Sequence, residues 1–175
     1  MGLLKQFKLL SEYNQLMNQR LYEAVAKLPD DLIKEDKGAF FKSLFGTLNH
    51  ILVGDIIWLS RFSTDPSSQD ALSYFINIEK PQSLNTVLYT EFSELKKERE
   101  KIDNLIILWI NSLTDKDLKS KISYKNMNGA SFQKEFSSLI NHLFLHQVHH
   151  RGQATTLLSQ FGIDFGETDL IEIIA

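Results

Sequence analysis

The sequence predicts an all-α protein, a four-helix bundle that occupies the whole chain, 1–175, as a single domain. Three observations lead to this prediction. Apolar residues recur at spacings of three and four in four long segments. Proline and glycine signals end or separate these segments. A chain of 175 residues can bury one hydrophobic core without help from a disulfide or a structural metal. Four long amphipathic helices in a chain of this size are typical of a bundle.

The predicted helices cover residues 7–28, 41–62, 84–113 and 131–161. The apolar stripe of the first helix ends at Pro29, and that of the second ends at Phe62. The third helix has the clearest helical period of the four, beginning at Leu84. The fourth begins near Ser131 and is stopped by Gly162, which has the place of a C′ residue.

The two longer connections add topology. The connection between helices two and three, "STDPSSQDALSYFINIEKPQS", has about twenty residues, whereas antiparallel neighbouring helices need only about 2 to 8. We therefore expect a long crossover that leaves helices two and three parallel. The connection between helices three and four, "SKISYKNMNGASFQ", alternates around a Met-Asn-Gly turn signal, which is typical of a small hairpin.

Composition and charge exclude several classes of protein. A net charge of −3 gives no electrostatic footprint for a phosphate backbone, so we expect no nucleic acid partner. No apolar run reaches the roughly 18 residues of a membrane span, and the N-terminus does not resemble a signal peptide. The absence of cysteine fits a reducing compartment and excludes a cysteine nucleophile or a thiolate ligand. We therefore expect a cytoplasmic protein without a membrane partner.

Histidine is concentrated in one short segment. Four of the five histidines lie in "HLFLHQVHHRGQ", residues 142–153. Residues four apart on a helix are offset by about 40° and lie about 6 Å apart along its axis, so two such imidazoles can bind one ion. His142 with His146, or His146 with His150, has this spacing, and His146 with His149 is a workable pair three residues apart. The spacing predicts a metal-binding pair and leaves open which two histidines form it.

The fifth histidine, His50, lies about ninety residues upstream, on a helix face where its neighbours Thr47 and Gly54 are small. Small neighbours leave room for another helix or a ligand, and bundles build metal sites where facing helices converge. A third imidazole from His50 would give a three-histidine site with an open position, the pattern of a catalytic metal. The alternative is that the histidines are hydrogen-bonded residues of the core.

Two stretches resemble the signature segments of the DinB/YfiT-like family of bacterial four-helix-bundle proteins. They are "SLFGTLNHILVGDIIWLSRF" and "HLFLHQVHHRGQA". In addition, "YNQLMNQRLYEAVAKLPDD" is similar to the first helix of that family and "GETDLI" to its C-terminal tail, so the resemblance spans nearly the whole chain. The family shares its name with an unrelated translesion polymerase, whose chemistry nothing in this sequence suggests.

The resemblance implies an up-down-down-up bundle, in agreement with the long crossover, and one divalent metal ion, nickel or zinc. The metal ligands would be His50 from the second helix and His146 and His150 from the fourth. His142 and His149 would then line the cavity or pack. The family also implies a homodimer through bundle helices. Six polar residues in family-like segments stay open between a role at the site and a structural one: Asn14, Asn18, Asp55, Arg99, Asp103 and Asp169.

The same resemblance suggests a reaction. Some members of the wider superfamily are thiol-dependent S-transferases or isomerases that use low-molecular-weight thiols. An open three-histidine metal can activate such a thiolate, or lower the pKa of bound water toward 7, without a protein cysteine. The leading hypothesis is a metal-dependent, S-transferase-like enzyme with an unknown small-molecule substrate and no assigned catalytic residue. Two alternatives stay open: a non-catalytic metal- or ligand-binding stress-response bundle, and a metal-dependent hydrolase.

Overall fold

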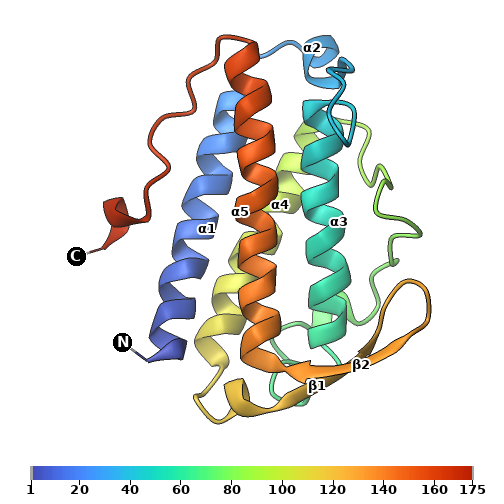
Figure 1. Ribbon diagram of the computed structural model, residues 1–175, viewed down its shortest axis with the longest axis vertical. Helices are drawn as coiled ribbons and strands as arrows, with labels where there is room; N and C mark the ends of the chain where they lie inside the picture. Colours follow the sequence, from blue (N-terminus) through green and yellow to red (C-terminus); the bar gives the residue numbers. More distant parts are fainter. Residues whose placement is uncertain (1, 175) are drawn as a thin grey trace.

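Four long helices form the body of the molecule. The structure is a computed structural model, and it describes residues 2–174. The helices are α1 (Leu3–Val25), α3 (Leu44–Phe62), α4 (Phe92–Ser112) and α5 (Phe136–Gln160). In Figure 1 the chain ascends in α1 and α5 and descends in α3 and α4. The segment 63–91 therefore returns along the length of the bundle, which is the crossover that its length predicted.

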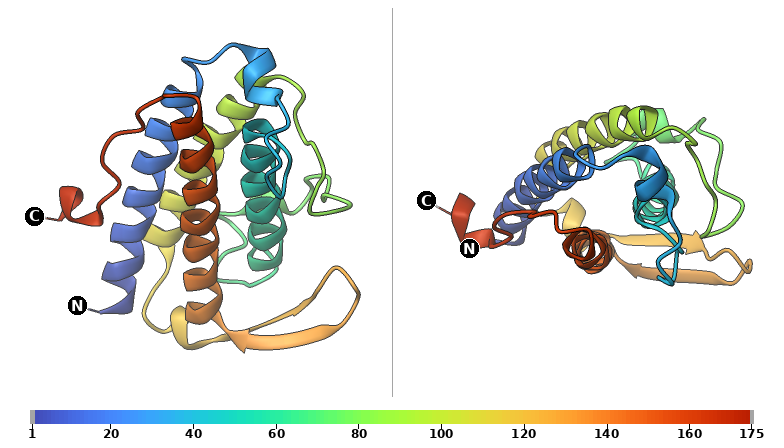
Figure 2. Two further views of the ribbon diagram at one scale, coloured as in Figure 1. Left: turned by 45° about the horizontal axis from the view of Figure 1, so that its top comes forward. Right: turned by 90° about the horizontal axis from the view of Figure 1, so that it is seen from above.

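Short elements lie between the long helices and after α5. They are α2 (Asp30–Lys34), η1 (Ser73–Phe75), η2 (Asp117–Lys119), β1 (Lys121–Lys125), β2 (Ser131–Glu135) and η3 (Leu170–Ile173). The predicted hairpin is present: β1 pairs antiparallel with β2, from Lys121 opposite Glu135 to Lys125 opposite Ser131. Figures 1 and 2 show it projecting from the start of α5, beyond the end of α3. The fold is thus mostly helical, with one two-stranded sheet.

The core lies between the four helices. Helix α1 packs against α4 and α5, and α3 packs against α5, as the view from above in Figure 2 also shows. Aromatic rings fill the end near the hairpin, where Phe62 lies 5.3 Å from both Trp109 and Phe136 between ring centroids. All three side chains are fully buried, and burial of each such side chain contributes about 1.5–3 kcal/mol. Among residues 2–174, no helix is long and apolar enough to cross a membrane.

A buried polar network links the four helices. The Arg99 guanidinium forms ion pairs with Asp55 and, at 2.9 Å, with Asp103. The seven buried members come from all four long helices: Asn14, Asn18, Asp55, Arg99, Asp103, Gln147 and Arg151. The salt-bridge interpretation of Asp55, Arg99 and Asp103 is therefore confirmed. So is the buried-network interpretation of Asn14 and Asn18, whereas Asp169 is exposed and directly precedes η3.

Three helix starts were predicted too early, at residues 41, 84 and 131 instead of 44, 92 and 136. Leu84 and Leu88 have helical spacing with Phe92, but α4 begins only at Phe92. The reason is a competing acceptor, since the Asn49 side-chain oxygen takes the backbone N–H groups of Leu88 and Tyr89 at 2.9 and 3.1 Å. Similarly, Phe132 lies on β2 because the hairpin continues to Glu135, immediately before α5.

The predicted end of α5 is confirmed. Gly162 has a φ of 72°. Its N–H donates to the carbonyl of Ser159, and the next N–H, that of Ile163, donates to the carbonyl of Leu158. These two bonds make a Schellman motif, which satisfies carbonyls that the last helical turn leaves without partners.

Candidate metal centre

Three of the five histidines converge between α3 and α5. One nitrogen from each of His50, His146 and His150 lies within 4.8 Å of the others. The ring centroids of His146 and His150 are 4.4 Å apart, as are those of His50 and His150. These are the three residues that the family resemblance named, and of the possible pairs on α5 the structure brings His146 and His150 together with His50.

Hydrogen bonds fix which nitrogen two of these rings present. His50 Nδ1 lies 2.9 Å from the carbonyl oxygen of Leu84, and His150 Nδ1 lies 2.8 Å from the side-chain oxygen of Gln153. The Leu84 carbonyl can only accept, so His50 Nδ1 carries the proton, and the Gln153 amide, with its oxygen turned toward the ring, assigns the same tautomer to His150. In the neutral rings each Nε2 is therefore a lone-pair acceptor.

Those two acceptors face each other. The Nε2 atoms of His50 and His150 are 3.1 Å apart, and neither has a proton to donate when both rings are neutral. Such a pair is repulsive unless a cation lies between the lone pairs. Two nitrogens bound to one tetrahedral zinc at about 2.0–2.1 Å would be roughly 3.3 Å apart. The donor set thus fits a divalent metal such as zinc or nickel, which imidazole ligands suit.

His146 completes the cluster because the facing helix leaves room for it. A Cβ added to Gly54 on α3 would lie 2.5 Å from Cε1 of His146, so only glycine lets the ring lie against the α3 backbone. The Nδ1 atom of His146 is buried and has no hydrogen-bond partner in the described part of the chain. Gly54, one helical turn after His50, therefore makes room for the third imidazole.

All three rings are held neutral. Burial lowers the pKa of His50 and of His150. Burial, together with the neighbouring imidazoles, lowers the pKa of His146 to about 3. Metal ions bind the neutral imidazole, so at pH 7 no proton has to be displaced from any of the three rings.

A groove of about 1060 Å³ opens over the three histidines. Phe41 forms one wall and stacks on His50, with ring centroids 3.8 Å apart and an interplanar angle of 16°. Other walls come from α3, α5, the crossover segment 82–85 and the hairpin tip 126–128. The cluster therefore lies at an accessible surface with an apolar wall, which leaves space for a small molecule.

The other two histidines line the same groove and are exposed. His142 packs edge-on against Trp58, with ring centroids 4.9 Å apart, and lies 6.1 Å from the His146 ring. His149 Nε2 lies 3.3 Å from the side-chain nitrogen of Gln153, the residue that orients His150. Both therefore take supporting positions, which the sequence had left open.

Sequence reasoning missed three contributors: Phe41, Leu84 and Gln153. Gln153 could have been found, because it follows His150 by three residues and so lies beside it on α5. Leu84 could not, because it acts through a backbone carbonyl in a segment that was predicted to be helical.

Replacing Gly54 with alanine is expected to push His146 out of the cluster and lower zinc affinity by at least about tenfold, while the protein still folds. Isothermal titration with zinc would measure this change. The matched control is Gly152→Ala on α5, where an added Cβ meets nothing within 4 Å. Equal zinc affinity in the Gly54→Ala and wild-type proteins would mean that His146 is not a ligand.

The stability of the metal-free protein should fall as the pH drops from about 6.5. The pKa of His146 is about 3 in the folded state, against 6.5 for an unperturbed imidazole, so the unfolded state binds more protons between those pH values. His50 and His150 act in the same direction. Asp103 and Asp55 oppose them, because burial raises the pKa of Asp103 to about 6 and also raises that of Asp55, so the folded state holds the extra protons.

The urea midpoint, measured at pH 7, 6 and 5, tests this dependence. His146→Gln should flatten the decline, and His149→Gln, at an exposed position, should leave it unchanged. A decline of the same steepness in His146→Gln and wild type would contradict the assignment.

Comparisons with known proteins agree in pointing to one family. The profile of the DinB family matches residues 3–174. Protein DinB of Bacillus subtilis (strain 168) is 27% identical over 161 residues, which cover 91% of this chain and 88% of that protein. No solved structure matches the chain.

Proposed function

The chain belongs to the DinB family, and from this premise we propose that it is a metal-dependent transferase that joins a low-molecular-weight thiol to a small electrophile. The proposed ligands of one nickel or zinc ion are His50, His146 and His150. The predicted homodimer and cytoplasmic location stay predictions.

One observation carries this proposal. Two neutral imidazoles present their Nε2 lone pairs to each other at 3.1 Å, with a third imidazole beside them, on the floor of an open groove. A buried arrangement of acceptors without donors is costly unless a cation satisfies it. Three protein ligands leave at least one further position for a substrate.

The bound metal would supply the positive charge that favours the thiolate form of the cosubstrate. Residues of the chain would orient the imidazoles and shield them from water. The Leu84 carbonyl and the Gln153 side chain hold two rings in the ligand tautomer, and Phe41 shields His50 from water. During transfer a sulfur electron pair forms the new S–C bond, and the leaving group departs with its bonding electrons. The thiol proton leaves at the mouth of the groove, where His142 and His149 are exposed bases.

The lining of the groove favours thiol transfer over hydrolysis. Attack by water asks for a general base close to the reacting carbon, most often a histidine or a carboxylate. Within residues 2–174, no aspartate or glutamate lines the groove, so a histidine outside the cluster, His142 or His149, would have to serve as that base. A thiol needs no such base, because it is already a nucleophile once ionised.

Turnover by the nickel- or zinc-loaded protein tests the proposal. Glutathione or bacillithiol would be supplied with monochlorobimane, and the fluorescent thioether followed. We expect the rate to exceed that of the metal-free protein by at least about 100-fold, and His50→Ala to resemble the metal-free protein. Stoichiometric metal without thioether formation with any thiol would instead support a non-catalytic binding protein. Metal-dependent cleavage of esters or amides would support the hydrolase.

A further inference from the structure

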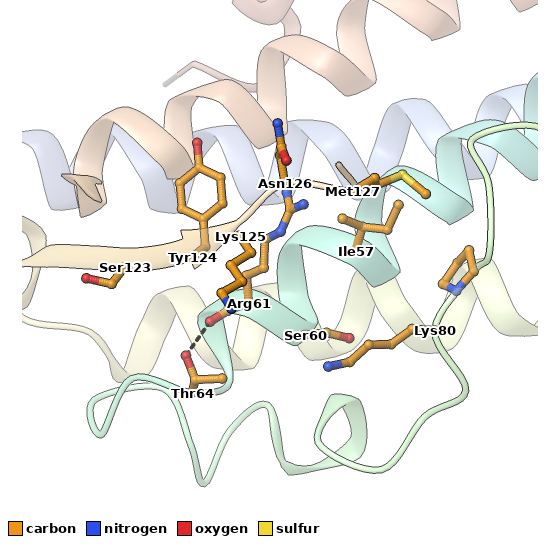
Figure 3. Close-up of a pocket in the computed structure, with 11 residues that line it drawn as sticks. Ile57, Ser60, Arg61, Thr64, Lys80, Ser123, Tyr124, Lys125, Asn126 and Met127 are labelled. Carbon is orange, nitrogen blue, oxygen red and sulfur yellow. Dashed lines mark hydrogen bonds between the residues drawn. The ribbon is translucent and has the colours of Figure 1, made fainter. Parts of the chain in front are cut away.

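A second cavity, of about 310 Å³, adjoins the groove over the histidines. The two cavities share four lining residues: Ile57, Arg61, Asn126 and Met127. Figure 3 shows the walls of the second cavity, which come from α3, the hairpin and the crossover segment. The two spaces are therefore parts of one surface depression, with the histidines at one end.

The second cavity is lined by three cations and no acid. They are Arg61 on α3, Lys80 in the crossover segment and Lys125 on β1. The chain has 22 aspartates and glutamates against 19 lysines and arginines, yet within residues 2–174 none of the acids lines either cavity. None of the three cations takes part in the ion pairs of the described residues. The positive charge is thus concentrated and uncompensated.

Arg61 is the centre of this charge. Its guanidinium lies 4.6 Å from the Trp58 ring centroid and 4.9 Å from that of Tyr124, so two aromatic faces hold it in place. It is half-buried, and burial lowers its pKa, which measures the cost of keeping it charged there. In the described residues its N–H groups have no protein acceptor. A planar, pre-oriented donor of this kind suits a carboxylate or a phosphate.

A second polar group in the same wall also lacks a partner. Ser60 is 5% exposed, and its hydroxyl has no hydrogen-bond partner among the described residues. Because Ser60 also lines the cavity, its hydroxyl can donate to an anionic ligand bound there. The cavity therefore offers both charge and a buried hydroxyl donor.

We propose that this cavity is a subsite for the anionic group of a small-molecule substrate whose thiol end lies at the histidines. The placement of the thiol at the histidines rests on the proposed function, whereas the anion subsite is argued from the second cavity alone. His50, Gly54, Ile57 and Arg61 follow one another at helical spacing, and eleven residues of helix span about 16 Å. The substrate class is therefore an elongated thiol with a carboxylate or phosphate far from its sulfur.

Thiols of graded length test the subsite. The nickel-loaded protein would be titrated with 3-mercaptopropionate, 6-mercaptohexanoate and 11-mercaptoundecanoate. Each acid would be compared with the mercapto-alcohol of equal chain length. Binding would be followed by the thiolate-to-nickel absorption band. We expect the longer acids to bind about tenfold more tightly than their alcohols. Arg61→Gln should abolish this advantage, and Arg61→Lys should restore part of it. Lys134→Gln, on β2 outside both cavities, is the matched control.

A second arm needs no thiol. Inorganic sulfate would be titrated into the zinc-loaded protein while the indole N–H resonance of Trp58, which packs on Arg61, is followed. If the ratio of mercapto-acid affinity to mercapto-alcohol affinity is the same in wild type and Arg61→Gln, the subsite is overturned and the proposed function still stands. If no thiol gives an absorption band, the thiol function fails. In that case, loss of the sulfate response in Arg61→Gln would still support the subsite, and an unchanged response would overturn it.

Discussion

His150→Ala is expected to lower zinc or nickel affinity by at least about 100-fold, and His50→Ala should do the same. Each substitution removes one of only three imidazole donors. It also breaks the 3.1 Å approach of the two Nε2 lone pairs, which is the feature that most requires a cation. Because the two residues lie on different helices, equal losses would establish that one ion is shared between α3 and α5.

Metal content per chain, measured by plasma mass spectrometry after reconstitution and desalting, checks this result. His142→Ala and His149→Ala are matched controls, because both side chains line the groove without belonging to the cluster. Gln153→Ala should give an intermediate loss, since it frees the His150 ring without removing a ligand. Near-stoichiometric metal in both His50→Ala and His150→Ala would mean that the histidines are packing residues.

Local patterns predicted the four long helices and the group of candidate histidines, but the choice of His50, His146 and His150 came from the family resemblance. Helical period places residues four apart on one face of α5, and small neighbours surround His50 on α3, which leaves several pairs possible. Gly54 shows why those small neighbours matter, since the His146 ring occupies the space that a side chain would fill. Likewise, the Met-Asn-Gly signal placed the hairpin at the correct turn.

Contacts between distant segments could not be predicted in this way. Leu84 and Leu88 fit a helical period, but the Asn49 side chain competes for the local backbone donors and keeps the segment extended. The Leu84 carbonyl that contacts His50 lies in a turn at the start of this segment. The stacking of Phe41 on His50 similarly depends on the turn before α3, where Lys42 has a φ of 66°. Long-range pairing of this kind leaves no periodic signal in the chain.

Arg99→Met is expected to destabilise the protein by about 3–5 kcal/mol, the cost of breaking a buried ion pair by removing one partner. Arg99 is 1% exposed and is the cation that neutralises both Asp55 and Asp103. Methionine has a similar apolar stem, so the loss would come mainly from two carboxylates left without their cation. Urea unfolding at pH 7.5 measures the free energy. Lys97→Met, exposed on the same helix, should change it by less than about 0.5 kcal/mol.

The pH dependence of this loss separates charge from packing. Burial already raises the pKa of Asp103 to about 6 and raises that of Asp55, with Arg99 acting against both increases. Without Arg99 both values should rise further, so the folded variant would bind protons that the unfolded chain, with a carboxyl pKa of 3.8, does not. The variant's deficit relative to wild type should therefore shrink as the pH falls from 7.5 to 5. A deficit that is constant over this range would assign the loss to packing alone, and the network would then be no more than a tight fit of side chains.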